Sequence, residues 1–185
     1  MLRAVLQPGQ VSGLEVQDYP HLEREFTWLV NYLKNVASGR LQGANVLLYG
    51  APGTGKSEFA RLLAEHAGLT AFDVQSADKD GDPVPGKTRL GLFAISQRFL
   101  SERQQSLVIF DEIEDVFPDV TSNFASLFGR GSSSSRSDQP KAWLNQQLEH
   151  SPVPAIWISN SIDAINDAFL RRFAFHVEFR TPPKA

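Results

Sequence analysis

Short apolar runs alternate with amphipathic stretches along most of the chain. The apolar runs cover residues 46–49, 69–74, 106–111, 155–158 and 175–179. Each has the length of a strand, and the continuous runs among them are typical of strands that are buried on both faces. Strands of this kind, alternating with helices, indicate a parallel sheet with helices packed on each side. The pattern therefore predicts an α/β domain built on five parallel strands.

The amphipathic stretches carry apolar residues at every third or fourth position, which is the spacing of one helix face. In the first stretch this face runs from Leu22 to Val36, and Gly39 suits the turn that ends a helix. Further helices are expected over residues 58–68 and 88–102, from Pro140 onward, and over residues 162–171.

Two segments lack a regular pattern. Residues 1–20 contain two prolines and two glycines, so we expect an irregular lead-in there. One core domain is expected over residues 21–185, and a chain of 185 residues is long enough for a substantial hydrophobic core. The serine-rich run over residues 129–137 favours a solvated loop over a recognition element.

The stretch from Gly50 to Ser57 follows the first strand and opens a helix. It fits the pattern G-x-x-x-x-G-K-[ST] at every constrained position. Its glycines let successive backbone N–H groups point at phosphate oxygens, and the positive end of the helix faces the same anion. Lys56 would reach the β- and γ-phosphates, and the Ser57 hydroxyl would hold Mg²⁺. The residues predicted to bind the nucleotide here are Gly50, Pro52, Gly53, Thr54, Gly55, Lys56, Ser57 and Glu58.

Polar side chains also follow two later strands. Asp111 and Glu112 close the third strand, and Asn160 closes the fourth. Because ligands of parallel sheets gather beyond the C-terminal strand ends, these side chains should face the phosphate loop. Asp111 would hold Mg²⁺ through water, Glu112 would orient and deprotonate the attacking water, and Asn160 would bond water and γ-phosphate. Taken alone, an acidic pair or an Asn at a strand end would be a solvated terminus or a turn former.

Charge and composition argue against several kinds of binding partner and site. The chain has 18 Lys and Arg against 21 Asp and Glu, and its net charge of −3 argues against a broad nucleic-acid surface. The absence of cysteine excludes disulfides and thiolate metal sites and is compatible with a cytoplasmic location. No apolar stretch has the length of a membrane span, so no membrane partner is expected.

Taken in order, these motifs resemble those of the AAA clade of AAA+ ATPases. The last matching segment, Asp167 to Phe173, is similar to the family's D-P-A-L-L-R-P-G-R-F if its internal Pro-Gly is deleted. The resemblance implies that Arg171 and Arg172 act in trans, at the γ-phosphate of the neighbouring subunit in a ring such as a hexamer. Both could instead be surface charges at a helix end, where cations are favoured. The resemblance also implies strand order 5-1-4-3-2 and places Asp18 and Tyr19 near the adenine.

A narrower similarity joins the chain to a group of bacterial AAA ATPases. It is carried by three segments, which are Asp18 to Leu22, Asp80 to Pro83 and Asp111 to Pro118. Within the last segment, Glu114 and Asp115 could be solvated or could contact a neighbouring subunit, and the solvated state is favoured.

The chain departs from the family in two places. The loop over residues 83–86 lacks the aromatic residue with which many members grip a threaded polypeptide. The chain also stops at Ala185 without the helical lid of the family, so we expect an excised core domain of a longer protein.

The resemblance implies an enzyme that binds ATP with Mg²⁺ and hydrolyses it to ADP and phosphate. In the full-length protein this reaction would drive remodelling of a protein or other macromolecule. Two alternatives stay open, namely an ATP-gated assembly module with incidental hydrolysis and a DNA-handling loader. The net charge and the form of the arginine segment speak against the loader.

Overall fold

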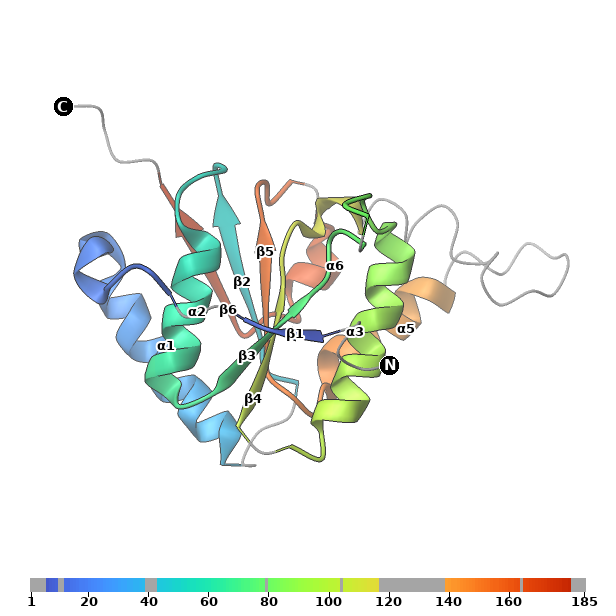
Figure 1. Ribbon diagram of the computed structural model, residues 1–185, viewed down its shortest axis with the longest axis horizontal. Helices are drawn as coiled ribbons and strands as arrows, with labels where there is room; N and C mark the ends of the chain where they lie inside the picture. The colour runs from blue at the N-terminus through green and yellow to red at the C-terminus, as the bar shows by residue number, and fades with distance from the viewer. Residues whose placement is uncertain are drawn as a thin grey trace, which may run out of the picture.

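The computed structural model describes residues 6–9, 12–38, 43–78, 80–103, 105–116, 139–163 and 165–180. Six strands form one sheet in the order β1-β3-β4-β5-β2-β6 (Figure 1). The strands are β1 (Leu6–Pro8), β2 (Asn45–Gly50), β3 (Thr70–Val74), β4 (Ser106–Phe110), β5 (Ala155–Ser159) and β6 (Phe175–Phe179).

Strands β2 to β6 pair in parallel and are the five strands predicted from the apolar runs. Numbered along the chain, they lie in the order 5-1-4-3-2, so the predicted P-loop α/β fold is confirmed. Strand β1 pairs antiparallel with the edge strand β3, from Leu6 opposite Val74 to Pro8 opposite Phe72. The predicted irregular lead-in was therefore wrong for Leu6–Pro8, because a strand of three residues is too short to show a period.

Helices cover both faces of the sheet. They are α1 (Glu23–Ala37), α2 (Lys56–Ala67), α3 (Gly86–Leu100), α5 (Gln139–His150) and the short α6 (Asp167–Leu170), with 3-10 turns η2 (Val16–Asp18), η3 (Pro20–Leu22) and η4 (Ile113–Asp115). Figure 1 shows α1 and α2 on one face, with α3 and α5 on the other. None of the helices in the described ranges is long and apolar enough to cross a membrane.

The sheet separates two hydrophobic clusters. Neighbouring residues of β2 contribute to opposite clusters, with Val46 and Leu48 packed under α1 and α2 and Leu47 packed toward α3 and α5. This alternation, with both faces covered, explains why the strand reads as a continuous apolar run. The cluster under α3 contains Trp157, whose indole ring stacks on Phe110 at 5.0 Å between ring centroids.

A buried polar pair connects β5 with the neighbouring strand β2 and with α5. The Trp157 Nε1–H donates to Asn45 Oδ1 at 2.8 Å, and Asn45 Nδ2 donates to the Leu148 carbonyl at 2.6 Å. Buried polar groups are stabilising only when they are paired in this way. Because Asn45 is the first residue of β2, the pair holds β2, β5 and α5 together at the end of β2 opposite the phosphate loop.

Helix boundaries differ from the sequence predictions by a few residues. Helix α2 already starts at Lys56, and α3 spans Gly86–Leu100 instead of 88–102. The helix predicted over 162–171 was too long, because the Asn166 side chain accepts the Ala168 N–H at 2.8 Å and caps a helix of four residues, Asp167–Leu170. The serine-rich run over 129–137 and the proposed stop at Gly39 lie outside the described residues.

Candidate functional site

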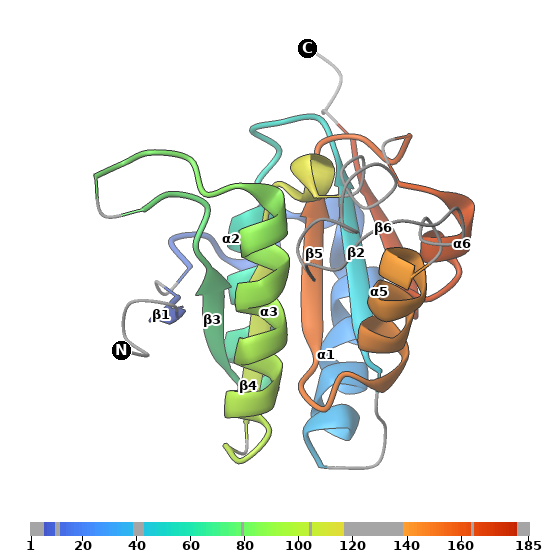
Figure 2. The same ribbon diagram turned by 90° about the vertical axis from the view of Figure 1, so that its right-hand side faces the viewer.

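The loops that follow β2, β4 and β5 meet at one end of the sheet (Figure 2). Because β5 lies between β4 and β2, the end of β5 is adjacent to both other loops. The phosphate loop follows β2, Asp111 and Glu112 follow β4, and Asn160 follows β5. Parallel pairing therefore brings together three motifs that are separated along the chain.

Glycines allow the phosphate loop its tight path. Gly50 has a φ of 140°, and a Cβ built on it would lie 2.1 Å from the Phe179 carbonyl oxygen. Gly55 has a φ of 84°, and its Cβ would lie 2.7 Å from the Tyr19 hydroxyl. Residues with a side chain rarely adopt these positive φ values, and a Cβ would also clash at both positions. Both positions therefore require glycine. The loop turns into the first residue of α2 directly after Gly55.

Lys56 is turned inward at the start of α2, with 5% of its surface exposed. Its Nζ donates to the carbonyls of Gly50 at 2.7 Å and Ala51 at 2.8 Å, and to Asn160 Oδ1 at 3.1 Å. Burial lowers the pKa of the Lys56 ammonium, and the carboxylates of Asp111 and Glu114 partly offset this. The Lys56 ammonium group therefore lies between the phosphate loop and the end of β5, surrounded by oxygen atoms.

Ser57 and Asp111 are in direct contact. Ser57 Oγ lies 2.5 Å from Asp111 Oδ2, and the other carboxylate oxygen of Asp111 accepts the Glu112 N–H at 2.8 Å. Hydroxyl and carboxylate oxygens are ligands that Mg²⁺ prefers. Among the described residues no group of three or more His, Cys, Asp or Glu could hold a metal. This donor set fits an ion such as Mg²⁺, which takes one or two protein ligands and completes its shell with water and phosphate oxygens.

Two contacts that the sequence did not reveal hold the loop after β4. The buried Arg89 of α3 donates from Nη1 to the Glu112 carbonyl at 2.9 Å and from Nη2 to the Asp111 carbonyl. Glu114 accepts the Ser159 hydroxyl at 3.0 Å and the backbone N–H of Asn160. The favoured prediction of a solvated Glu114 was therefore wrong, because η4 turns this carboxylate back toward β5. The side chain of Asp115 is not described.

Comparison with known proteins identifies the family. The family model described as "ATPase family associated with various cellular activities (AAA)" matches residues 46–181. The chain belongs to this family. An AAA domain accounts for the joint presence of the phosphate loop, the acidic strand end and Asn160.

Curated relatives contain this AAA domain as a part. The chain is 27% identical over 154 residues to an uncharacterized protein, ORF529, of Acidianus two-tailed virus, covering 80% of the chain and 28% of the relative. It is 29% identical over 197 residues to the ATP-dependent zinc metalloprotease FtsH of Mycoplasma genitalium, covering 98% of the chain and 26% of the relative. The chain thus spans about a quarter of the length of these relatives.

Solved structures share the fold at low sequence identity. The FIGL-1 AAA domain in complex with ADP has a TM-score of 0.58 at 19% identity, covering 96% of this chain and 59% of that one. A chain of the HORMA:CdnC:Trip13 complex of E. coli MS115-1 has a TM-score of 0.63 at 14% identity, covering 98% of this chain and 72% of that one. Both comparisons support the AAA fold.

The resemblance places Asp18 and Tyr19 near the adenine, and Tyr19 packs against the phosphate loop. Tyr19 is 4% exposed, its ring meets Phe59 edge-on at 5.0 Å, and its hydroxyl donates to the Gly55 carbonyl at 2.9 Å. Burial raises the pKa of Tyr19 to about 12, with smaller contributions from Glu58 and Asp18. The ring therefore supports the loop from inside the protein, whereas the exposed Asp18 accepts the Glu15 N–H at 2.8 Å. A role for either residue at the adenine stays a prediction.

The remaining loop residues lie on the surface of the site. Pro52 is exposed, and the Thr54 hydroxyl donates to the Ala51 carbonyl at 2.8 Å. Glu58 accepts the Gly13 N–H at 3.1 Å and pairs with Arg61 at 2.7 Å. Burial would raise the pKa of Glu58, but these partners, together with the Ser12 hydroxyl, hold it below its usual value.

The two candidate arginines lie in the turn after α6. Arg171 is exposed, whereas Arg172 Nε donates to Glu149 Oε1 at 2.8 Å and its Nη1 donates to the Ala168 carbonyl. Neither takes part in the contacts that join the phosphate loop to the ends of β4 and β5. This placement is compatible with action on another subunit, which stays a prediction.

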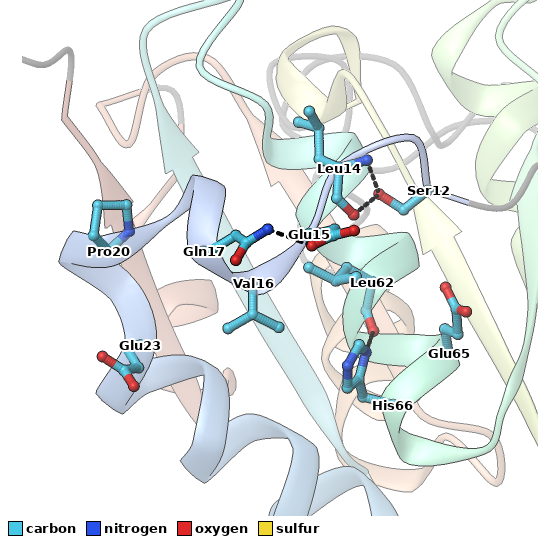
Figure 3. A pocket seen from close by; sticks show the side chains of 10 residues that line it. All are labelled: Ser12, Leu14, Glu15, Val16, Gln17, Pro20, Glu23, Leu62, Glu65 and His66. Atoms are coloured by element: carbon cyan, nitrogen blue, oxygen red, sulfur yellow. Dashed lines mark hydrogen bonds between the residues drawn. The ribbon is translucent and has the colours of Figure 1, made fainter.

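One pocket reaches the site at Asp111, and a second lies apart from it. One, of about 360 Å³, extends from Asp111 along β3 past Asp73 and Arg61. The other, of about 780 Å³, lies between η2 and α2 (Figure 3). Its lining includes Glu15, Val16 and Leu62, with no residue of the phosphate loop itself.

Proposed function

We propose that this AAA domain binds ATP with Mg²⁺ and hydrolyses it to ADP and phosphate. The observation that supports this most strongly is the 2.5 Å contact between Ser57 Oγ and Asp111 Oδ2. It joins the phosphate loop to the end of β4 across 54 residues of chain. A hydroxyl and a carboxylate beside a phosphate-binding loop are the protein ligands with which P-loop enzymes hold Mg²⁺.

The binding roles follow from the chemistry of the side chains. Lys56 offers a point charge to the β- and γ-phosphates, whose oxygens would replace the carbonyl oxygens of Gly50 and Ala51 as its acceptors. Ser57 would hold Mg²⁺ directly and Asp111 would hold it through water. When bound, Mg²⁺ neutralises charge on the phosphates during transfer.

The hydrolytic roles belong to the residues after β4 and β5. Glu112 takes a proton from a water molecule, the water oxygen bonds to the γ-phosphorus, and the bond from that phosphorus to the bridging oxygen of ADP breaks. Asn160 orients the water and the γ-phosphate through its amide. The Lys56 contact at 3.1 Å already holds the Asn160 side chain toward the loop.

In the full-length protein we propose that hydrolysis drives remodelling of a macromolecule by a ring of subunits. Arg171 or Arg172 would stabilise charge at the γ-phosphate of the neighbouring subunit. The FtsH relatives, named as ATP-dependent proteases, support an ATP-driven task. The loop over residues 83–86 has no aromatic residue, which argues against threading by an aromatic grip.

The experiment measures phosphate release against protein concentration for the wild type and for Glu112→Gln. Turnover that rises steeply with concentration and vanishes in the variant supports the proposal. Oligomers that form with ATP but release no phosphate would indicate an ATP-gated assembly module instead. Turnover that depends on added DNA would support a loader.

Two further variants complete the test, one for nucleotide binding and one as a control. Lys56→Ala should abolish ATP binding, and unchanged affinity would refute the assignment of the loop. Glu102→Gln, in the exposed turn after α3, is the matched control for Glu112→Gln and should keep full turnover.

A further inference from the structure

Arg89 is a charged residue in the interior of the domain. It lies in the first turns of α3, and 1% of its surface is exposed. Burying a guanidinium group is costly unless its N–H groups find acceptors. The position of those acceptors therefore indicates what the residue does.

The guanidinium group contacts three consecutive residues at the end of β4. Nη1 donates to the Glu112 carbonyl at 2.9 Å, Nη2 donates to the Asp111 carbonyl, and the guanidinium carbon lies 4.8 Å from the centre of the Phe110 ring. Two donors of one planar group thus bind two adjacent carbonyls. Arginine can do this because its N–H groups form a rigid fork, which the single ammonium of lysine lacks.

The backbone held by Arg89 has an unusual conformation. Glu112 has a φ of 53° and a ψ of 57°, which is the left-handed region that residues other than glycine seldom adopt. The parallel pairing of β4 with β5 ends at Phe110 opposite Trp157, so Asp111 and Glu112 lie beyond the ladder. Their carbonyls find donors in the Arg89 side chain instead. The left-handed turn at Glu112 sets the direction in which its carboxylate leaves the chain.

We propose that Arg89 is a positioning residue for ATP hydrolysis. By holding the carbonyls of Asp111 and Glu112 it fixes the left-handed turn and so directs the Glu112 carboxylate at the attacking water. This inference rests on the proposed function. It assigns Arg89 no contact with nucleotide or metal.

The test uses Arg89→Lys and Arg89→Met, with Arg98→Met on the exposed side of the same helix as the control. We expect kcat for phosphate release to fall about 10- to 100-fold in both Arg89 variants, because small errors in placing a catalytic group have costs of this order. The Kd for ATP should change less than about 3-fold, because the phosphate loop is untouched. Amide hydrogen exchange should accelerate over residues 112–116, a readout that does not depend on turnover.

The Glu112→Gln variant separates this inference from the function on which it rests. If Glu112→Gln alone keeps full turnover, the proposed function fails. If Glu112→Gln is inactive while Arg89→Lys and Arg89→Met keep wild-type kcat, the positioning role fails.

Two other outcomes would also overturn the positioning role. One is a parallel loss of ATP affinity and thermal stability in Arg89→Lys with no selective loss of kcat, which would indicate a purely structural residue. The other is failure of Arg89→Lys to fold, which would make Arg89 a requirement of the fold itself.

Discussion

Glu114 and Asn160 are joined by a hydrogen bond from the Asn160 backbone N–H to the Glu114 carboxylate. The same carboxylate accepts the Ser159 hydroxyl at 3.0 Å, so η4 is attached to the end of β5 at two points. Asn160 is also held from the other side, because its Oδ1 accepts from Lys56 Nζ at 3.1 Å. The residue expected to sense the γ-phosphate is therefore fixed through both its backbone and its side chain.

The first prediction concerns Glu114. Replacing it with alanine removes the carboxylate oxygen that accepts both hydrogen bonds from Ser159 and Asn160, so Asn160 should lose its fixed position. We expect Glu114→Ala to lower kcat for ATP hydrolysis about 10-fold with little change in ATP affinity. Steady-state phosphate release together with nucleotide titration measures the two effects separately.

Glu114→Gln is the conservative variant for this prediction, because its amide oxygen can accept the same two hydrogen bonds. It should restore most of the turnover. Full activity in Glu114→Ala would mean that the contact with Asn160 is not needed for positioning.

Much of the site could be predicted because its motifs are local. The glycines, Lys56 and Ser57 lie within eight consecutive residues, and the apolar runs placed the ends of β4 and β5 at the same edge. Arg89 could not be predicted, because its acceptors are backbone carbonyls 22 and 23 residues further along the chain. The spacing of apolar residues identifies single helices and strands, but not the contacts between them. An arginine in a helix also ordinarily indicates a solvated position.

The second prediction concerns the steric requirement at Gly50. In Gly50→Ala the new Cβ would meet the Phe179 carbonyl oxygen at 2.1 Å, and the backbone of β6 cannot move without breaking its pairing with β2. We expect a loss of at least about 3 kcal/mol in the free energy of unfolding, measured by denaturant titration. Gly53→Ala is the matched control, since its Cβ meets nothing within 4 Å and only the φ of 75° is unfavourable. It should cost about 1 to 2 kcal/mol, and equal losses in the two variants would contradict the clash.

The third prediction concerns Asp73, next to the pocket that reaches Asp111. Burial raises the pKa of Asp73, Arg61 at 3.5 Å opposes this shift, and Asp111 and Glu58 add to it. The folded state therefore binds more protons than the unfolded state between the unfolded pKa, about 3.9, and the raised folded value. The contribution of Asp73 to the free energy of unfolding accordingly falls as the pH rises through that window.

Asp73→Asn should remove the free-energy cost of burying an ionised carboxylate at this position. We expect the Tm at pH 7 to rise by about 2 °C, which corresponds to less than about 1 kcal/mol for a domain of this size. The advantage should disappear below about pH 4, where the aspartate is protonated in both states. Thermal unfolding over a pH series measures this, with the exposed Asp163→Asn as control. A lower Tm at pH 7 would show that the ion pair with Arg61 outweighs the cost of burial.

The last prediction separates the two arginines after α6. Arg172 is held within its own chain by Glu149 at 2.8 Å and by the Ala168 carbonyl, whereas Arg171 is exposed. An arginine that acts on a neighbouring subunit must be able to leave its own surface, so Arg171 is the better candidate for the trans-acting residue. We expect Arg171→Ala to spare ATP binding and to lower kcat about 10³-fold, and only at protein concentrations where rings form. Arg172→Ala, by contrast, should cost up to about 1 kcal/mol of stability through its partly exposed ion pair. If Arg171→Ala weakens a dilute monomer as much as the assembled protein, Arg171 acts within its own subunit.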